Sequence, residues 1–71
     1  MNAGAITLTL NGKARALPGE LMLPELLTTL GVDRRLIAIA VNGEIVARDR
    51  YEGVALRDGD SVEVVRMVGG G

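Results

Sequence analysis

The side chains that most often carry chemistry are scarce in this chain of 71 residues. It contains no Cys and no His, which excludes a thiolate nucleophile, a nucleophile–histidine pair and a His-ligated metal. Nine acidic residues are present, but most fall at expected turns or solvent-facing positions. Asp58 and Asp60 flank Gly59, a pattern typical of a tight turn that supplies too few ligands for a calcium loop. We expect no autonomous catalysis, no metal site and no bound cofactor.

One further reactive group is the terminal carboxylate, which follows Gly69, Gly70 and Gly71. Glycine has no Cβ atom, so these residues can thread a narrow channel and adopt almost any backbone angles. Fully extended, they reach about 10–11 Å beyond a folded domain, enough to place the carboxylate of Gly71 in a partner's active site. Adenylation with ATP would activate it, and incoming sulfur would leave a thiocarboxylate. The alternative is an idle terminus or a cloning remnant.

Composition narrows the classes of partner. The net charge is −1 and basic residues are dispersed, which argues against a nucleic-acid interface; we expect the Arg34-Arg35 pair to lie in a solvated loop. No apolar run approaches the ~18 residues of a membrane span, so we expect a soluble, cytoplasmic protein with no membrane partner. Hydrophobic residues make up 48% of the chain, with a single aromatic, so the core must be aliphatic.

Hydrophobic periodicity predicts the secondary structure. Residues 6–10 alternate as a half-buried strand, Asn11-Gly12 predicts a tight hairpin turn, and a second strand runs to about residue 17. Leucines at 23, 26, 27 and 30 form one stripe of a short helix that ends at Gly31. Met22 stands at the expected N-cap, where about 1 kcal/mol of capping is absent. Residues 37–41 and 44–46 predict a second hairpin, and residues 61–68 a last strand.

This order predicts an α+β domain with the ββαββ arrangement of a β-grasp, a ubiquitin-like fold in which a mixed sheet packs on one helix. We expect one domain over residues 1–68, followed by a flexible glycine tail over residues 69–71. The first and last strands should lie parallel at the centre of the sheet. Tyr51, in the looser stretch 47–56, should pack at the edge of the core with its hydroxyl group in water.

The last strand also predicts a docking surface. Val62 and Val64 should face the helix, whereas Val65 and Met67 should lie on the opposite face beside the tail. An apolar pair at that position suits a partner surface, and the alternative is that neighbouring strands cover it or that it is simply exposed. We expect Val65, Met67 and Val68 to dock the partner, with Leu56 extending the patch.

Four segments carry a resemblance to a known family: "NGKARAL", "LPELLTTLGV", "IAIAVNGEIVAR" and "LRDGDSVEVVRMVGGG". Together they resemble the ThiS family of thiamine-biosynthetic sulfur carriers over nearly the whole chain. The resemblance implies a β-grasp fold and a terminal diglycine, here Gly70-Gly71. An E1-like enzyme would adenylate its carboxylate with ATP, and a sulfur donor protein would supply the sulfur for the thiocarboxylate. Thiazole synthase would accept the sulfur.

Some residues depart from the family pattern. Met22 stands where Thr is frequent, Ala47 where Pro is frequent, and Tyr51 where Trp is frequent, which leaves the tail chemistry untouched. The small subunit of molybdopterin synthase has the same fold and tail, but "VVRMVGGG" lacks the aromatic and Pro residues that often precede its diglycine. Sulfur carriers for cysteine synthesis and ubiquitin-like modifiers share the tail as well, and a plain interaction module is a further alternative.

Overall fold

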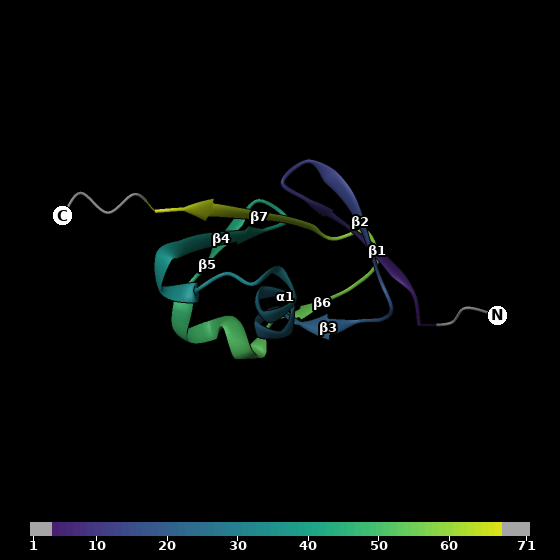
Figure 1. Ribbon diagram of the computed structural model, residues 1–71, viewed down its shortest axis with the longest axis horizontal. Coiled ribbons are helices and arrows are strands. Elements are labelled where there is room, and N and C mark those ends of the chain that lie inside the picture. Colours follow the sequence, from purple (N-terminus) through teal and green to yellow (C-terminus); the bar gives the residue numbers. More distant parts are fainter. Residues whose placement is uncertain (1–3, 68–71) are drawn as a thin grey trace.

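The structure, a computed structural model, describes residues 4–67. They form seven strands, one α-helix and two short 3-10 helices (Figure 1). In chain order these are β1 (Ile6–Leu10), β2 (Lys13–Leu17), β3 (Leu21–Met22), α1 (Leu23–Leu30), η1 (Arg34–Leu36), β4 (Ile37–Val41), β5 (Glu44–Val46), η2 (Arg48–Gly53), β6 (Ala55–Leu56) and β7 (Ser61–Arg66).

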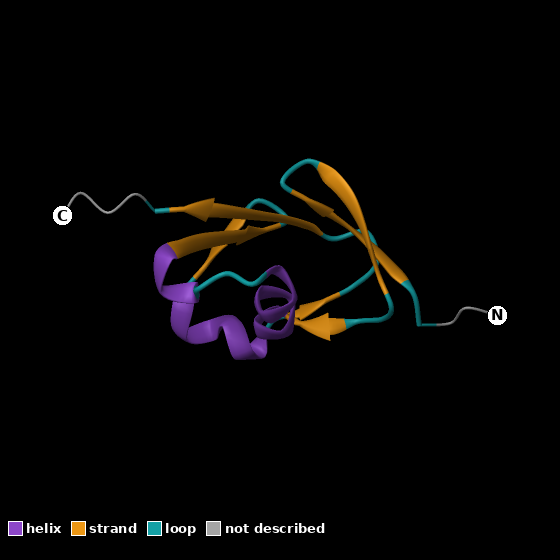
Figure 2. Cartoon of the chain, in the orientation of Figure 1, coloured by secondary structure: helices purple, strands orange, loops and turns teal. Residues whose placement is uncertain are grey.

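Five strands form one mixed sheet in the order β2-β1-β7-β4-β5. β1 and β7 pair in parallel at its centre, whereas the β1–β2, β4–β5 and β4–β7 pairs are antiparallel. The helix α1 and the 3-10 helix η2 lie on one side of this sheet (Figure 2). The predicted β-grasp arrangement, including the parallel central pair, is therefore confirmed.

Both predicted Asn-Gly turns are present, and both bond to β7. Asn11 and Asn42 adopt φ values of 50° and 51°, and the glycines that follow have φ values of 82° and 86°, the positive pair that a two-residue hairpin turn requires. The Asn11 amide accepts the Val64 N–H at 2.8 Å and donates to the Val64 carbonyl at 3.3 Å. The Asn42 Oδ1 accepts the Ser61 N–H at 2.9 Å. The two turns therefore hold β7 from both sides.

The helix α1 begins and ends as predicted. The Met22 side chain makes no cap hydrogen bond, but the Glu25 carboxylate accepts the Met22 backbone N–H at 2.8 Å. This is half of a capping box, and it replaces part of the missing cap energy. Gly31 closes the helix at φ 71°, and its N–H donates to the Thr28 carbonyl at 3.1 Å.

The core lies between α1, η2 and the sheet. Eleven buried residues compose it: Ile6, Leu8, Leu17, Leu23, Leu26, Leu27, Ile37, Ile39, Tyr51, Leu56 and Val62. Tyr51 is only 1% exposed, so it lies within the core and not at its edge, where the sequence placed it. The reason is a cover that the sequence does not reveal, because the Arg34 guanidinium lies over the Tyr51 ring at 4.9 Å from its centroid.

Two further differences concern short elements. The two-residue strands β3 and β6 pair with each other as a second small sheet, Leu21 opposite Leu56 and Met22 opposite Ala55, and hydrophobic periodicity did not predict them. β7 ends at Arg66, two residues before the expected end at Val68. None of the helices among residues 4–67 is long and apolar enough to span a membrane.

Candidate functional site

The candidate site lies where β7 ends, because the predicted tail follows it in the chain. Val68, Gly69, Gly70 and Gly71 fall outside the residues that the structure describes, so their predicted roles remain predictions. The last described residue, Met67, donates its backbone N–H to the Leu36 carbonyl at 2.8 Å. Arg66 lies opposite Ile37 in the β4–β7 pair. The chain is therefore anchored to the sheet up to the residue before Val68.

The predicted alternation along β7 is confirmed. Val62 is fully buried and Val64 is partly buried against the core. Val65 and Met67 lie on the opposite, helix-free face, with 60% and 44% of their surfaces exposed. Their docking role stays a prediction, but both side chains are available to a partner.

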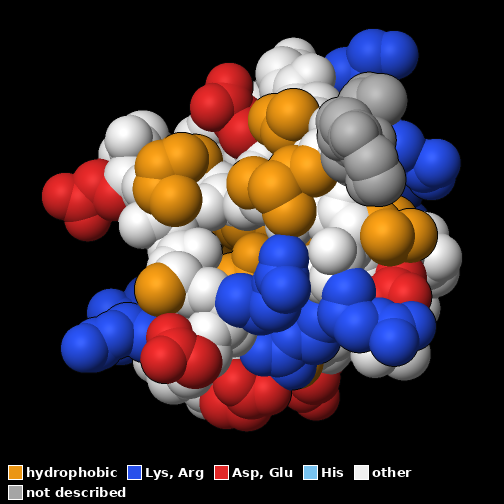
Figure 3. All heavy atoms as spheres, turned by 90° about the vertical axis from the view of Figure 1, so that its left-hand side faces the viewer, with side chains coloured by type: hydrophobic (Ala, Val, Ile, Leu, Met, Phe, Trp, Pro, Cys, Tyr) orange, Lys and Arg blue, Asp and Glu red, His pale blue; other side chains and the backbone are white. Residues whose placement is uncertain are grey.

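Two exposed residues that the sequence reasoning missed extend this apolar surface. Leu36 is 51% exposed and Ile45 is 77% exposed. Leu36 could have been found by continuing the β4 alternation one residue backward, and Ile45 by counting across the Asn42-Gly43 turn, which pairs it with Ala40. We name Leu36, Ile45, Val65 and Met67 the outer patch. Figure 3 shows hydrophobic side chains gathered on the face that carries the end of β7.

Leu56 does not belong to the outer patch, and its predicted docking role is wrong. Its side chain is 0% exposed. β6 pairs with β3 rather than with the five-stranded sheet, and this pairing turns Leu56 into the core. Leu56 therefore contributes to stability rather than to a partner surface.

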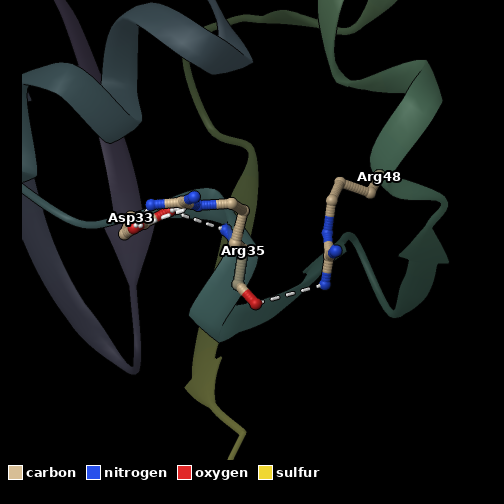
Figure 4. A network of polar contacts seen from close by, with 3 residues as sticks. All are labelled: Asp33, Arg35 and Arg48. Carbon is tan, nitrogen blue, oxygen red and sulfur yellow. Dashed lines mark hydrogen bonds and ion pairs between the residues drawn. The ribbon is translucent and has the colours of Figure 1, made fainter.

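A polar network around η1 supports the backbone to which Met67 bonds. Asp33 caps η1, since its Oδ1 accepts the Arg35 N–H at 2.9 Å, and its Oδ2 lies 2.8 Å from the Arg35 Nη2 (Figure 4). These bonds from Arg35 lower the pKa of Asp33 to about 2. The Arg48 guanidinium donates to the Arg35 carbonyl at 3.4 Å. The network therefore links η1 to η2.

Arg34 makes the second link between the same elements. Its guanidinium binds the Glu52 carboxylate through two bonds of 2.6 and 3.2 Å and donates to the Arg48 carbonyl at 2.7 Å. The bonds from Arg34 lower the pKa of Glu52. Arg34 thus does not lie in a free loop, as the sequence suggested, but joins η1 to η2 across the ring of Tyr51.

The remaining acidic residues that could suggest chemistry serve the fold. Asp58 accepts the Thr7 N–H at 2.7 Å, and Asp60 accepts the Arg57 N–H at 2.9 Å and the Asn42 amide at 3.1 Å. Between residues 4 and 67, no three acidic side chains gather in a way that could hold a metal ion. The feature that stands out in this part of the chain is the apolar outer patch beside β7.

These features define a ubiquitin-like β-grasp domain with an exposed apolar patch on its helix-free face. The sequence profile of the ThiS family matches residues 8–71, and the chain belongs to that family. Over 62 residues it is 40% identical to the sulfur carrier protein ThiS of Thermus thermophilus, covering 87% of this chain and 95% of that protein. A crystal structure of the thiamine biosynthesis protein ThiS from Geobacter metallireducens superimposes with a TM-score of 0.82 at 35% identity, covering 93% of this chain and all of that one.

A third similarity is to a larger protein. Over 64 residues the chain is 42% identical to a thiazole synthase of Paramagnetospirillum magneticum. That match covers 90% of this chain but only 20% of the larger protein, so the chain spans about a fifth of its length. Family membership makes the chain a sulfur carrier protein of the thiamine-biosynthetic type, which is a substrate of other enzymes and not itself an enzyme.

Proposed function

We propose that the chain carries sulfur as a thiocarboxylate on Gly71 and delivers it for thiazole formation in thiamine biosynthesis. The observation that carries this proposal is the family match, which extends to Gly71 in a sequence without Cys or His. Because neither a thiol nor an imidazole is available, the carboxylate is the best group for holding sulfur. The family resemblance and the chemistry of carboxylates supply the steps.

The proposed chemistry has two steps. The Gly71 carboxylate attacks the α-phosphorus of ATP on an E1-like adenylating enzyme, and pyrophosphate leaves. Sulfide-level sulfur (HS−), supplied through a sulfur donor protein, then attacks the acyl carbon and displaces AMP. One carboxylate oxygen leaves with AMP, and sulfur takes its place in the thiocarboxylate. ATP binds to the partner enzyme, so the carrier itself needs no cofactor. The role of the carrier is to position its terminus. Met67 is hydrogen-bonded to Leu36, so only the residues after Met67 need to enter the active site of the adenylating enzyme.

Thiazole synthase is the proposed acceptor of the sulfur. The similarity to one fifth of a thiazole synthase supports this choice, because a carrier domain joined to its acceptor has the high effective concentration that transfer favours. The outer patch would then serve two partners in turn, first the adenylating enzyme and then thiazole synthase. A shared surface would keep the carrier from binding both at once.

The experiment that tests the proposal is a measurement of intact mass. The purified chain is incubated with ATP, its adenylating enzyme and a sulfur donor, and we expect a gain of about 16 Da, the difference between sulfur and oxygen. Reactions without ATP or without the sulfur donor serve as controls and should leave the mass unchanged. An unchanged mass in the complete reaction, with an enzyme shown to be active on its own carrier, would contradict the proposal.

A substitution in the outer patch tests its docking role. We expect Val65→Asp to raise the KM for the carrier in adenylation about tenfold, because a charge replaces an apolar contact that the partner must desolvate. The turnover number should change little, and so should the melting temperature, since Val65 is 60% exposed. The matched control is Ala14→Asp, an exposed position on the edge strand β2, which is separated from β7 by β1. Equal KM values for the two variants would dismiss the docking role.

A further inference from the structure

The basic residues are unevenly placed in this chain, although its net charge is −1. Five of the eight lie on η1, on η2 or at the last position of β7: Arg34, Arg35, Arg48, Arg50 and Arg66. The two 3-10 helices and the N-cap of η1 contain three carboxylates, those of Asp33, Asp49 and Glu52. Figure 3 shows basic side chains grouped directly beside the hydrophobic ones on this face. The end of the molecule from which the tail departs is therefore locally positive.

Chain position, strand pairing and one side-chain hydrogen bond bring three of these arginines close to Met67, the last described residue. Arg35 lies next to Leu36, whose carbonyl accepts the Met67 N–H. Arg66 directly precedes Met67 and lies opposite Ile37, the residue after η1. Arg48 reaches the same place through its 3.4 Å hydrogen bond to the Arg35 carbonyl. We name Arg35, Arg48 and Arg66 the exit rim.

The charges of the exit rim are available to a partner. All three residues are exposed, and the Arg35 side chain keeps 78% of its surface free despite its ion pair with Asp33. Within residues 4–67, neither Arg48 nor Arg66 has a carboxylate within ion-pair distance. Arg34 differs, because Glu52 and the Tyr51 ring already engage it. The rim thus has guanidinium groups that the fold itself does not neutralise.

We propose that the exit rim binds a carboxylate-rich surface on the enzyme that adenylates the tail. A guanidinium binds a carboxylate through two parallel hydrogen bonds, so an acidic protein surface is the matching partner. Charges around an apolar contact steer the encounter and fix its orientation, which the outer patch alone cannot do. Nucleic acid is a poorer match, because the only aromatic side chain, Tyr51, is buried and no base can stack on it.

This inference deepens the proposed function and rests on it, and charge reversal at two rim positions tests it. The test variant is R48E/R66E, and the matched control is R15E/R57E, which changes the net charge equally at exposed positions on β2 and in the turn after β6. We expect R48E/R66E to raise the KM for the carrier in ATP–pyrophosphate exchange about tenfold at low salt, with the turnover number within about twofold. At high salt the difference should shrink as the charges are screened. The control should stay near wild type.

Several results would contradict the proposed binding role of the exit rim. One is an equal rise in KM for both variants, which would reflect net charge alone, and another is no rise for R48E/R66E. A third result concerns the affinity of the carrier for the enzyme, measured with and without ATP. If R48E/R66E lowers this affinity only when ATP is present, the rim contacts nucleotide phosphate and not an acidic protein surface. If charge reversal disturbs folding, the milder variant R48Q/R66Q replaces it in the same assay, and circular dichroism verifies that this variant is folded. If wild-type carrier is not adenylated, the proposed function fails instead, so the two failures are distinguishable.

Discussion

Removal of Gly71 is expected to abolish thiocarboxylate formation while the domain remains folded. The shortened chain would place its carboxylate about 3.5 Å short of the reacting phosphorus, and a displacement of that size is enough to remove a near-attack geometry. Among residues 4–67, no residue of the buried core lies beyond Val62, so the melting temperature should change by no more than about 1–2 °C. Intact mass after the complete reaction and a thermal melt measure the two effects separately.

Variants that keep the chain length or block the carboxylate provide the controls. Gly71→Ala retains the carboxylate and should react more slowly but measurably, because a Cβ must fit where glycine passes. A short C-terminal tag removes the free carboxylate of Gly71 and should be as damaging as the deletion, whereas the same tag at the N-terminus should be tolerated. Wild-type rates in the C-terminally tagged chain would favour a plain interaction module over a sulfur carrier.

Much of the fold could be predicted because its strongest signals are local. The Asn11-Gly12 and Asn42-Gly43 turns require positive φ values that few other dipeptides tolerate, and the alternating strands beside them follow directly. The leucine stripe from residue 23 to residue 30 and Gly31 likewise defined the helix within its own sequence. The ββαββ order then leaves few ways to bury one helix against one sheet.

Features that depend on tertiary contacts could not be read in this way. The strands β3 and β6 have two residues each, too few for any periodicity, and each depends on pairing with the other, which places Leu21 opposite Leu56. Tyr51 was expected at the edge of the core, but Arg34, which is 17 positions away, closes over its ring. Such partners are fixed by packing rather than by spacing.

The residues of the candidate site likewise divide into those that local pattern predicts and those that tertiary contacts bring together. Val65 and Met67 follow from strand alternation, so their exposure could be predicted, and Leu36 and Ile45 required only the correct pairing of neighbouring strands. The exit rim could not be predicted, because it joins residues from three separate elements. Arg48 in particular stands in a stretch without regular periodicity, and only the fold of η2 brings it to Arg35.

Leu56→Ala separates the corrected role of this residue from the one that the sequence suggested. We expect the free energy of unfolding to fall by about 2–5 kcal/mol, the usual cost of truncating a fully buried leucine. A domain of this size rarely gains more than about 3–5 kcal/mol from its core, so the substitution should remove most of the stability. Urea denaturation followed by circular dichroism measures this loss. The matched control is Val65→Ala, exposed on the outer patch, which should change stability by less than about 0.5 kcal/mol but weaken adenylation. The opposite pattern, in which the Leu56→Ala variant is stable but poorly adenylated, would support a docking role for Leu56 and contradict its place in the core.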